Sequence, residues 1–426
     1  MTSATSSSSQ ARALARLTAA IFILAGTFIS TRAIAQTTRP ATAPSGFGRG
    51  RGGGVEDSVA RGTISPVVSP DHRITFRLRA PNAKQVQVRG DFTIHMSTIL
   101  DMTKDNDGVW SYTTEPLKPS SYQYWFIMDG LILPDPVNTY VRPASGVYKS
   151  QVDVPGPEMD FMAFKDVPHG ELREHLYINR DNGTQRRVVV YVPPGYNTSE
   201  KSYPVLYLLH GANDFERGWT QTGRANLIMD NLLAAGKTLP AIIVMPFGHD
   251  VTGSTGRQAE IRYTQQALGV TPAAGGGRGR GGAGPSFMEK DLLGNVIPLV
   301  EKEYRVIKDA RHRAIIGYSM GAGHSSAIGL SHPELFNYVG IYSGGSSANA
   351  IAPALADVDK TNKTYKMIWV GCGDDDTTAI GGTRNLHNLL TTRGVNHIYV
   401  ETPGAHHDYQ VWRIYLETNL PMLFRD

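Results

Sequence analysis

Residues 315–323 read Ile-Ile-Gly-Tyr-Ser-Met-Gly-Ala-Gly, an apolar run that leads into the pentapeptide Gly317-Tyr318-Ser319-Met320-Gly321. Small, helix-compatible residues follow, so the stretch predicts a strand, a tight turn and a helix in succession. The two glycines permit a turn that Cβ atoms would obstruct, and such a turn raises the serine hydroxyl above the edge of a sheet. A Gly-x-Ser-x-Gly match is weak evidence by itself, because chance matches are expected.

The chain around this motif alternates apolar strands with helices. Apolar runs that predict strands occur at residues 188–192, 205–209, 241–245, 314–316, 338–341, 367–370 and 399–401, and helical stretches at 288–302 and 383–393. The alternation predicts an α/β domain with a doubly wound, mostly parallel sheet over residues 160–426. Functional residues in such sheets gather at the carboxyl ends of strands.

A different pattern precedes this domain, at residues 62–155. Short runs with a period of two recur at residues 73–78, 85–88, 109–113 and 122–128, separated by turn residues. The dipeptide Asp129-Gly130 is a strong hairpin signal. We therefore predict a small antiparallel β-sandwich of the immunoglobulin-like type.

The N-terminus has the features of an export signal. Arg12 and Arg16 precede an apolar stretch at residues 17–29, and Ala33-Ile34-Ala35 fits a small-x-small cleavage site. The stretch is shorter than the ~20 apolar residues that span a bilayer. We predict that residues 1–35 are a signal peptide and that the mature protein is periplasmic or extracellular, without a stable membrane anchor; an uncleaved anchor is the alternative.

Two tracts rich in glycine and arginine interrupt the chain. Residues 36–61 predict a flexible linker, and residues 274–284 predict a surface loop, for which we hypothesise a role as a flap beside the substrate cleft. Arg-Gly tracts can contact RNA. However, the signal peptide holds three arginines and no acid, so the remainder has a formal net charge of +1 rather than +4, and we predict no nucleic-acid partner.

Acyl transfer by a serine needs a general base, a carboxylate that orients the base, and donors for the oxyanion. In α/β-hydrolases the carboxylate follows the serine in the chain, on a late strand. The strand at 367–370 runs into a turn with three carboxylates, Asp374, Asp375 and Asp376. Asp376 is favoured because it stands clear of the strand, whereas the other two fit turn or helix-cap positions. The single cysteine, Cys372, lacks any neighbour that would support a thiol nucleophile.

The base and the oxyanion donors fall at other strand ends. The loop after the last strand contains His406 and His407, and both suit the base. The amide of Met320, directly after the serine, is one expected oxyanion donor. The amide of Ala212 is the other, since His210-Gly211 directly follows an apolar strand.

Four segments taken in order carry a family resemblance: LYLLHG with Trp219, GYSMG, VGCGDDD and ETPGAHHDYQVWR. Together they resemble the esterase D and feruloyl esterase group of α/β-hydrolases, which includes carbohydrate esterase family 1 and enterochelin esterases. The resemblance covers about residues 165–426. It implies an acid three residues after the glycine of the strand-end turn, which selects Asp376.

The closing motif of this group is similar to Gly-Gly-His-x-Trp-x-x-Trp. Counting back from Trp412 selects His407 as the base, with Tyr409 in the first aromatic position. Counting forward from Gly404 selects His406 instead, so this loop is one residue longer than the pattern. The resemblance favours His407.

Residues 62–155 resemble the glycogen-binding and isoamylase N-terminal β-sandwich, a module that often precedes such esterases. Its Trp110 and Trp125 could stack on sugar rings, but alternating aromatic residues of a sandwich more often belong to the core, and we expect core positions for both.

The sequence thus predicts an exported serine ester hydrolase that uses no metal or organic cofactor. Its expected site comprises Ser319, Asp376 and His407, with Ala212 and Met320 as oxyanion donors. Feruloyl or acetyl esters of plant polysaccharide are the expected substrates, with glycan contact by the sandwich as a further expectation. The alternatives are an enterochelin-type siderophore esterase, and, from another class, a non-catalytic glycan-binding protein.

Overall fold

The computed structural model describes residues 63–93, 98–144, 147–212, 214–249 and 286–425, all within one compact unit, Gly53–Asp426. The predicted signal peptide, the linker at 36–61 and the tract at 274–284 lie outside the described residues. In the described part of the chain, no helix has both the length and the apolar character needed to cross a membrane.

The N-terminal part is a β-sandwich, as predicted. One sheet contains, in spatial order, β1 (Val67–Val68), β2 (Ile74–Arg79), β6 (Val109–Thr113) and β5 (Thr103–Lys104). The other contains β4 (Leu100–Asp101), β3 (Val86–Gly90), β7 (Ser120–Met128), β10 (Val147–Val154) and β9 (Val141–Ala144), with β8 (Leu131–Leu133) paired to β7. All pairings within these sheets are antiparallel.

Alternation along the strands builds the sandwich core. Buried and half-buried residues alternate through β2 and β3, which turns Ile74, Phe76 and Val88 inward against Tyr124 and Phe126. The predicted hairpin joins β7 to β8, and its two central residues have the positive φ angles that a type I′ turn requires, 48° at Asp129 and 86° at Gly130.

An eight-stranded sheet forms the second part, reached through a short 3-10 helix (Pro157–Met162). Its strands in spatial order are β11 (Glu171–Ile178), β12 (Gln185–Val192), β14 (Ile242–Pro246), β13 (Val205–Leu209), β15 (Arg313–Tyr318), β16 (Tyr338–Tyr342), β17 (Met367–Gly373) and β18 (Ile398–Thr402). β12 runs antiparallel to both of its neighbours, and all pairings from β14 onward are parallel. This is the predicted α/β-hydrolase fold, with one strand, β11, that the sequence patterns did not reveal.

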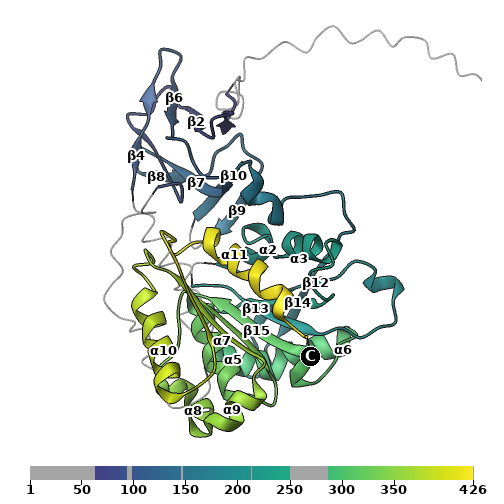
Figure 1. Ribbon diagram of the computed structural model, residues 1–426. Coiled ribbons are helices and arrows are strands. Elements are labelled where there is room, and N and C mark those ends of the chain that lie inside the picture. Colours follow the sequence, from purple (N-terminus) through teal and green to yellow (C-terminus); the bar gives the residue numbers. More distant parts are fainter. Residues whose placement is uncertain (1–62, 94–97, 145–146, 213, 250–285, 426) are drawn as a thin grey trace, which may run out of the picture. The chain divides into compact units, whose positions relative to one another are not determined.

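Helices cover both faces of this sheet (Figure 1). One face carries α5 (Phe287–Asp291), α6 (Ile297–Glu303), α7 (Met320–Ser331), α8 (Ala352–Ala356), α9 (Val358–Thr364) and α10 (Ile380–Arg393). The other carries α2 (Gly218–Gln221), α3 (Ala225–Ala234) and α11 (Tyr409–Asn419). Small residues let α7 lie close to the sheet: a Cβ atom on Gly329 would come within 2.7 Å of Ile315.

The helical stretch predicted at 288–302 is divided in the structure. A π-helical turn, Leu292–Val296, separates α5 from α6. Pro298, in the first turn of α6, has no N–H to donate to a carbonyl of the preceding turn. This missing hydrogen bond accounts for a departure from regular α-helix beside Pro298. A capping box between Ser286 and Glu289 begins the segment.

Candidate active site

Ser319 occupies the sharp turn between β15 and α7. Its backbone angles, φ 55° and ψ −117°, are unfavourable for a residue with a side chain, which is characteristic of a strained turn at a reactive serine. Neither flanking glycine tolerates a Cβ atom: on Gly317 it would collide with the carbonyl of Gly321, and on Gly321 it would lie 2.6 Å from the carbonyl oxygen of Leu209. The turn can therefore be this tight only with glycine at both positions.

His407 and Asp376 complete a chain of contacts from the serine. Ser319 Oγ lies 2.9 Å from His407 Nε2, and His407 Nδ1 lies 2.8 Å from Asp376 Oδ2. The other carboxylate oxygen of Asp376 accepts from the amides of Thr378 (3.1 Å) and Ala379 (2.9 Å). The structure thus brings the three predicted residues together.

Asp376 is held as a carboxylate although its side chain is fully buried. Burial alone would raise the pKa of Asp376, but the hydrogen bond and charge of His407, with a hydrogen bond from Ser343, outweigh it and lower that pKa. The carboxylate is therefore ionised at neutral pH and can orient the imidazole ring.

The neighbouring candidates lie elsewhere. His406 Nδ1 is 3.4 Å from the carbonyl oxygen of Asp375. The carboxylate of Asp374 accepts from the amide of Gly404 at 2.6 Å, which ties the two strand-end loops together. Of the two histidines that the sequence left in competition, His407 is the one that reaches Ser319.

The predicted oxyanion donors flank the serine. Met320 is the first residue of α7, so its amide has no acceptor within the helix. Ala212 lines the same pocket as Ser319. The preceding His210 is buried, with Nδ1 2.8 Å from the carbonyl of Gly211 and Nε2 accepting from Gly248 N at 2.8 Å. Burial, together with His249, lowers the pKa of His210 to about 4, so this ring is a neutral structural support.

Residues from both domains form the pocket beside Ser319, which has a volume of about 100 Å³. The esterase side includes Gly211, Ala212, Asp214, Tyr318, Ser319, His407, Asp408, Tyr409 and Trp412, and the sandwich contributes Gln123, Arg142 and Lys149. Burial, then the nearby Arg142, lowers the pKa of the Lys149 ammonium to about 8. Sequence reasoning missed these three residues, because they lie in ordinary strand patterns with no motif.

Cys372 places a protonated thiol beside the carboxylate of Asp376. Its side chain is buried, and burial followed by the charge of Asp376 raises its pKa to about 12. The Sγ atom donates to Asp376 Oδ2 at 3.4 Å. Within the described residues, no group of three or more His, Cys, Asp or Glu side chains is placed to hold a metal ion.

The strand order and the serine turn define the chain as an α/β-hydrolase. The family described as "Putative esterase" matches residues 180–423, and "Carbohydrate-binding module 48 (Isoamylase N-terminal domain)" matches residues 65–138. Since the first match covers more than half of the chain, the chain belongs to this esterase family.

Two curated relatives and one solved structure extend the comparison. An endo-1,4-beta-xylanase/feruloyl esterase from Xylanibacter ruminicola is 32% identical over 369 residues, which cover 84% of this chain and 46% of the relative. An esterase from Mycobacterium tuberculosis is 32% identical over 264 residues, covering 51% of this chain and 52% of the relative. The chain spans about half the length of the curated relatives it matches.

The structure of the enterobactin esterase from Shigella flexneri in the presence of enterobactin is also similar. It has a TM-score of 0.57 and 18% sequence identity, and the match covers 82% of this chain and 92% of that chain. At this identity the likeness concerns the fold.

Proposed function

We propose that the chain is an exported serine ester hydrolase with Ser319, His407 and Asp376 as its catalytic triad. The observation that carries the proposal is the unbroken contact from Ser319 Oγ through both ring nitrogens of His407 to Asp376, at 2.9 and 2.8 Å. A triad is identified by geometry and roles rather than by sequence position.

In the proposed reaction, Ser319 Oγ attacks the ester carbonyl carbon while His407 Nε2 accepts the hydroxyl proton. The amides of Ala212 and Met320 stabilise the oxyanion of the tetrahedral intermediate. The carbon–oxygen bond to the alcohol then breaks, and His407 returns the proton to the leaving oxygen. Water, deprotonated by the same ring, attacks the acyl-enzyme and releases the acid with a free Ser319.

Hydrolysis of p-nitrophenyl acetate by the wild type and by Ser319→Ala tests this function. We expect Ser319→Ala to lose at least roughly 10³-fold in kcat, since losses of that order or more follow removal of a triad nucleophile. Equal rates for the two proteins would overturn the serine mechanism. No turnover by the folded wild type would favour the alternative of a non-catalytic glycan-binding protein.

We propose feruloyl or acetyl esters of plant polysaccharide as the substrate class. The carbohydrate-binding module match at residues 65–138 supports a polysaccharide substrate, and one relative bears the name xylanase/feruloyl esterase. The measurement is kcat/KM on methyl ferulate, acetylated xylan and a catecholate siderophore. A preference for the siderophore would favour the enterochelin-type alternative.

The tryptophans of the sandwich do not offer open platforms for sugar. Trp110 is buried in the core and donates to the carbonyl of Ala80 at 2.9 Å. Trp125 is 6% exposed and lies outside that core, with the cationic groups of Arg89 and Lys149 over its ring at 5.3 and 4.9 Å. Glycan contact therefore needs other aromatic side chains.

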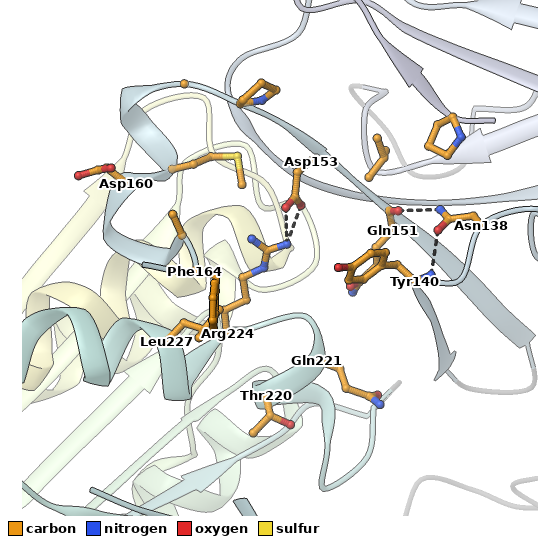
Figure 2. A pocket seen from close by; sticks show the side chains of 16 residues that line it. Asn138, Tyr140, Gln151, Asp153, Asp160, Phe164, Thr220, Gln221, Arg224 and Leu227 are labelled. Carbon is orange, nitrogen blue, oxygen red and sulfur yellow. Dashed lines mark hydrogen bonds and ion pairs between the residues drawn. The ribbon is translucent and has the colours of Figure 1, made fainter. Parts of the chain in front are cut away.

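A larger cavity, of about 740 Å³, meets this need (Figure 2). Tyr140 and Phe164, which are 73% and 77% exposed, stand on either side of it in Figure 2, with the Asp153–Arg224 ion pair between them. The Asp153 and Arg224 charges offset each other, and Asp160, the other charged residue of the lining, pairs with Lys165 at 2.8 Å. The cavity therefore presents mainly aromatic rings and carboxamides, which suits a neutral sugar chain. We propose this cavity as the polysaccharide contact of the protein.

Export is proposed from the N-terminal residues alone. The signal features at residues 1–35 predict a mature chain that begins at Gln36. Mass determination of the protein recovered outside the cytoplasm checks this cleavage, and an intact N-terminus in that fraction would support the uncleaved anchor.

A further inference from the structure

The carboxylate of Asp214 lies buried at the end of the loop that carries Ala212. Its backbone N–H donates to the carbonyl of Gly211 at 3.2 Å, which closes the turn around Ala212. Oδ1 accepts from the amide of Phe215 at 2.9 Å. Oδ2 accepts from the hydroxyls of Tyr318 at 2.7 Å and Tyr409 at 2.6 Å. One carboxylate thus holds three chain segments.

Each of these segments carries a proposed catalytic group. Tyr318 immediately precedes Ser319, and Tyr409 follows His407 by two residues. The Tyr318 ring also stacks on the Trp412 ring, with the ring centroids 3.9 Å apart. The rings of Trp412 and His407 are perpendicular to each other, with their centroids 5.1 Å apart. A shift of Asp214 would therefore reach the nucleophile, the base and the oxyanion loop together.

The countercharge of Asp214 comes from the sandwich. Arg142 of β9 places Nη1 2.8 Å from Asp214 Oδ1, and the two side chains are only 5% and 4% exposed. Arg142 is itself fixed, since its Nε and Nη2 donate to Gln123 Oε1 at 3.0 and 2.6 Å. Burial would raise the pKa of Asp214, but the charge of Arg142, the largest opposing effect, lowers it.

We propose that Arg142 is a positioning residue for the esterase reaction, acting through Asp214. The esterase reaction then depends on a residue of the sandwich, independently of any glycan that the sandwich binds. The inference rests on the proposed triad.

The physical reason is the cost of an unpaired buried carboxylate. Without Arg142, Asp214 either takes up a proton or turns toward solvent. A protonated Asp214 has a hydroxyl in place of one acceptor, and a displaced one loses both tyrosines. Either response loosens Tyr318 and Tyr409, and small misplacements of catalytic groups reduce rates sharply.

The experiment is steady-state hydrolysis of p-nitrophenyl acetate by Arg142→Met, Asp214→Asn and the double variant. The small acetyl ester limits direct substrate contact with the sandwich. We expect Arg142→Met to lose roughly 10- to 100-fold in kcat with KM changed less than about 3-fold. In the Asp214→Asn background the same substitution should change kcat by less than about 3-fold, because the charge it neutralises is already absent.

Two further variants isolate positioning from loss of domain contact. Gln410→Ala removes a different link between the domains, the donation from Gln410 Nε2 to the carbonyl of Asp91 at 3.3 Å, and should keep kcat within about 2-fold of the wild type. Arg142→Lys keeps the charge and should recover part of the kcat lost in Arg142→Met. It also supplies a folded comparison if Arg142→Met is too unstable to assay.

Several results would overturn the inference. These are a kcat for Arg142→Met within 2-fold of the wild type, an equal loss in Gln410→Ala, or an undiminished loss in the Asp214→Asn background. A rise in KM at unchanged kcat would make Arg142 a substrate contact instead. Failure of the triad is seen separately, as activity retained by Ser319→Ala.

Discussion

Two buried carboxylates support the residues around Ser319, and each contacts a different kind of partner. Asp376, from the turn after β17, contacts His407 of its own domain at 2.8 Å. Asp214, from the loop after β13, pairs with Arg142 of the sandwich, also at 2.8 Å. In both, burial would raise the pKa of the carboxyl and the partner lowers it.

The difference lies in when the partner is charged. A guanidinium is permanently cationic, so the Asp214 pair is a fixed part of the architecture. An imidazole is cationic only while it holds a second proton, which Ser319 supplies in the proposed reaction, so the charge opposite Asp376 is not a permanent one. In the proposed mechanism, Asp376 therefore stabilises a transient charge, whereas Asp214 maintains the positions of the groups that react. The substitutions below test this division.

The largest effect is expected for Asp376→Asn. The amide can still contact His407, but it cannot stabilise the imidazolium and favours the wrong tautomer. We expect kcat for p-nitrophenyl acetate to fall by roughly 10³- to 10⁴-fold. Asp214→Asn is the matched control and should lose less, because its amide oxygen can still accept from Tyr318 or Tyr409. Equal losses in the two variants would remove the proposed division of roles.

A large effect on stability is expected at the other carboxylate. Removing one partner of a buried ion pair costs about 3–5 kcal/mol, so Arg142→Met should lower the free energy of unfolding by about that amount near pH 7. Denaturant unfolding of the full chain measures the difference. The same substitution at the exposed Arg384, which pairs with Glu401 on the surface, is the control and should change the free energy of unfolding far less than Arg142→Met does.

The pH dependence of that difference follows from the sign of the shift. In the wild type the folded-state pKa of Asp214 is depressed, so its stabilisation is complete above the unfolded value of about 3.9 and is lost as the pH falls through the folded pKa. In Arg142→Met, burial without the cation should raise the pKa above the unfolded value. The ionised carboxyl then destabilises the variant at neutral pH, and protonation relieves this at lower pH. The difference in the free energy of unfolding between the wild type and Arg142→Met should therefore become smaller from pH 7 to pH 5. A difference that stays constant over this range would count against an ionised Asp214 as its source.

The sequence was sufficient to predict which strand ends of the esterase domain carry the proposed triad. Ser319, Asp376 and His407 each follow a strand that local apolar runs revealed, and parallel strands bring their carboxyl ends to one edge. Hydrophobic pattern and chain order therefore placed these residues near one another. The resemblance favoured His407 over His406, although the loop is one residue longer than the family pattern, and the structure places His407 Nε2 2.9 Å from Ser319 Oγ.

The residues that the sandwich contributes to the pocket beside Ser319 could not be predicted in the same way. Arg142 and Lys149 face each other across the β9–β10 pairing, and β9 is a short edge strand of four residues, too short to give a clear periodic signal. Tertiary packing decides which surface of the sandwich contacts which surface of the esterase domain. No local pattern at Arg142 points to Asp214, 72 residues further along the chain. Strand β11 was not predicted for a related reason, because its exposed and half-buried residues lack a clear apolar alternation.

A smaller effect, confined to binding, is expected at the proposed glycan cavity. Tyr140→Ala and Phe164→Ala each remove an exposed aromatic face, which should weaken retention on arabinoxylan by roughly 5- to 10-fold, the scale of about 1 kcal/mol for an aromatic contact. Affinity electrophoresis provides the measurement. Tyr148→Ala is the matched control, because Tyr148 is also exposed on the sandwich but does not line the cavity. Unlike Arg142→Met, these variants should hydrolyse p-nitrophenyl acetate at the wild-type rate. Retention equal to that of the wild type would exclude the cavity as the glycan contact.

The smallest effect is expected at Cys372, a further group in contact with Asp376. Its thiol has a pKa raised to about 12, so it stays protonated and supplies only a weak hydrogen bond to Oδ2 at 3.4 Å. His407 and the amides of Thr378 and Ala379 remain on Asp376 when the thiol is removed. Cys372→Ala should therefore keep kcat within about 3-fold of the wild type while lowering the free energy of unfolding by about 1–2 kcal/mol, the usual cost of a small buried truncation. A loss above 10-fold in kcat at unchanged fold would mean that the thiol helps to hold Asp376 in place. The contacts of Asp376 with His407, Thr378 and Ala379 would then not suffice to position it. Like Asp214, it would depend on a further buried side chain for its position.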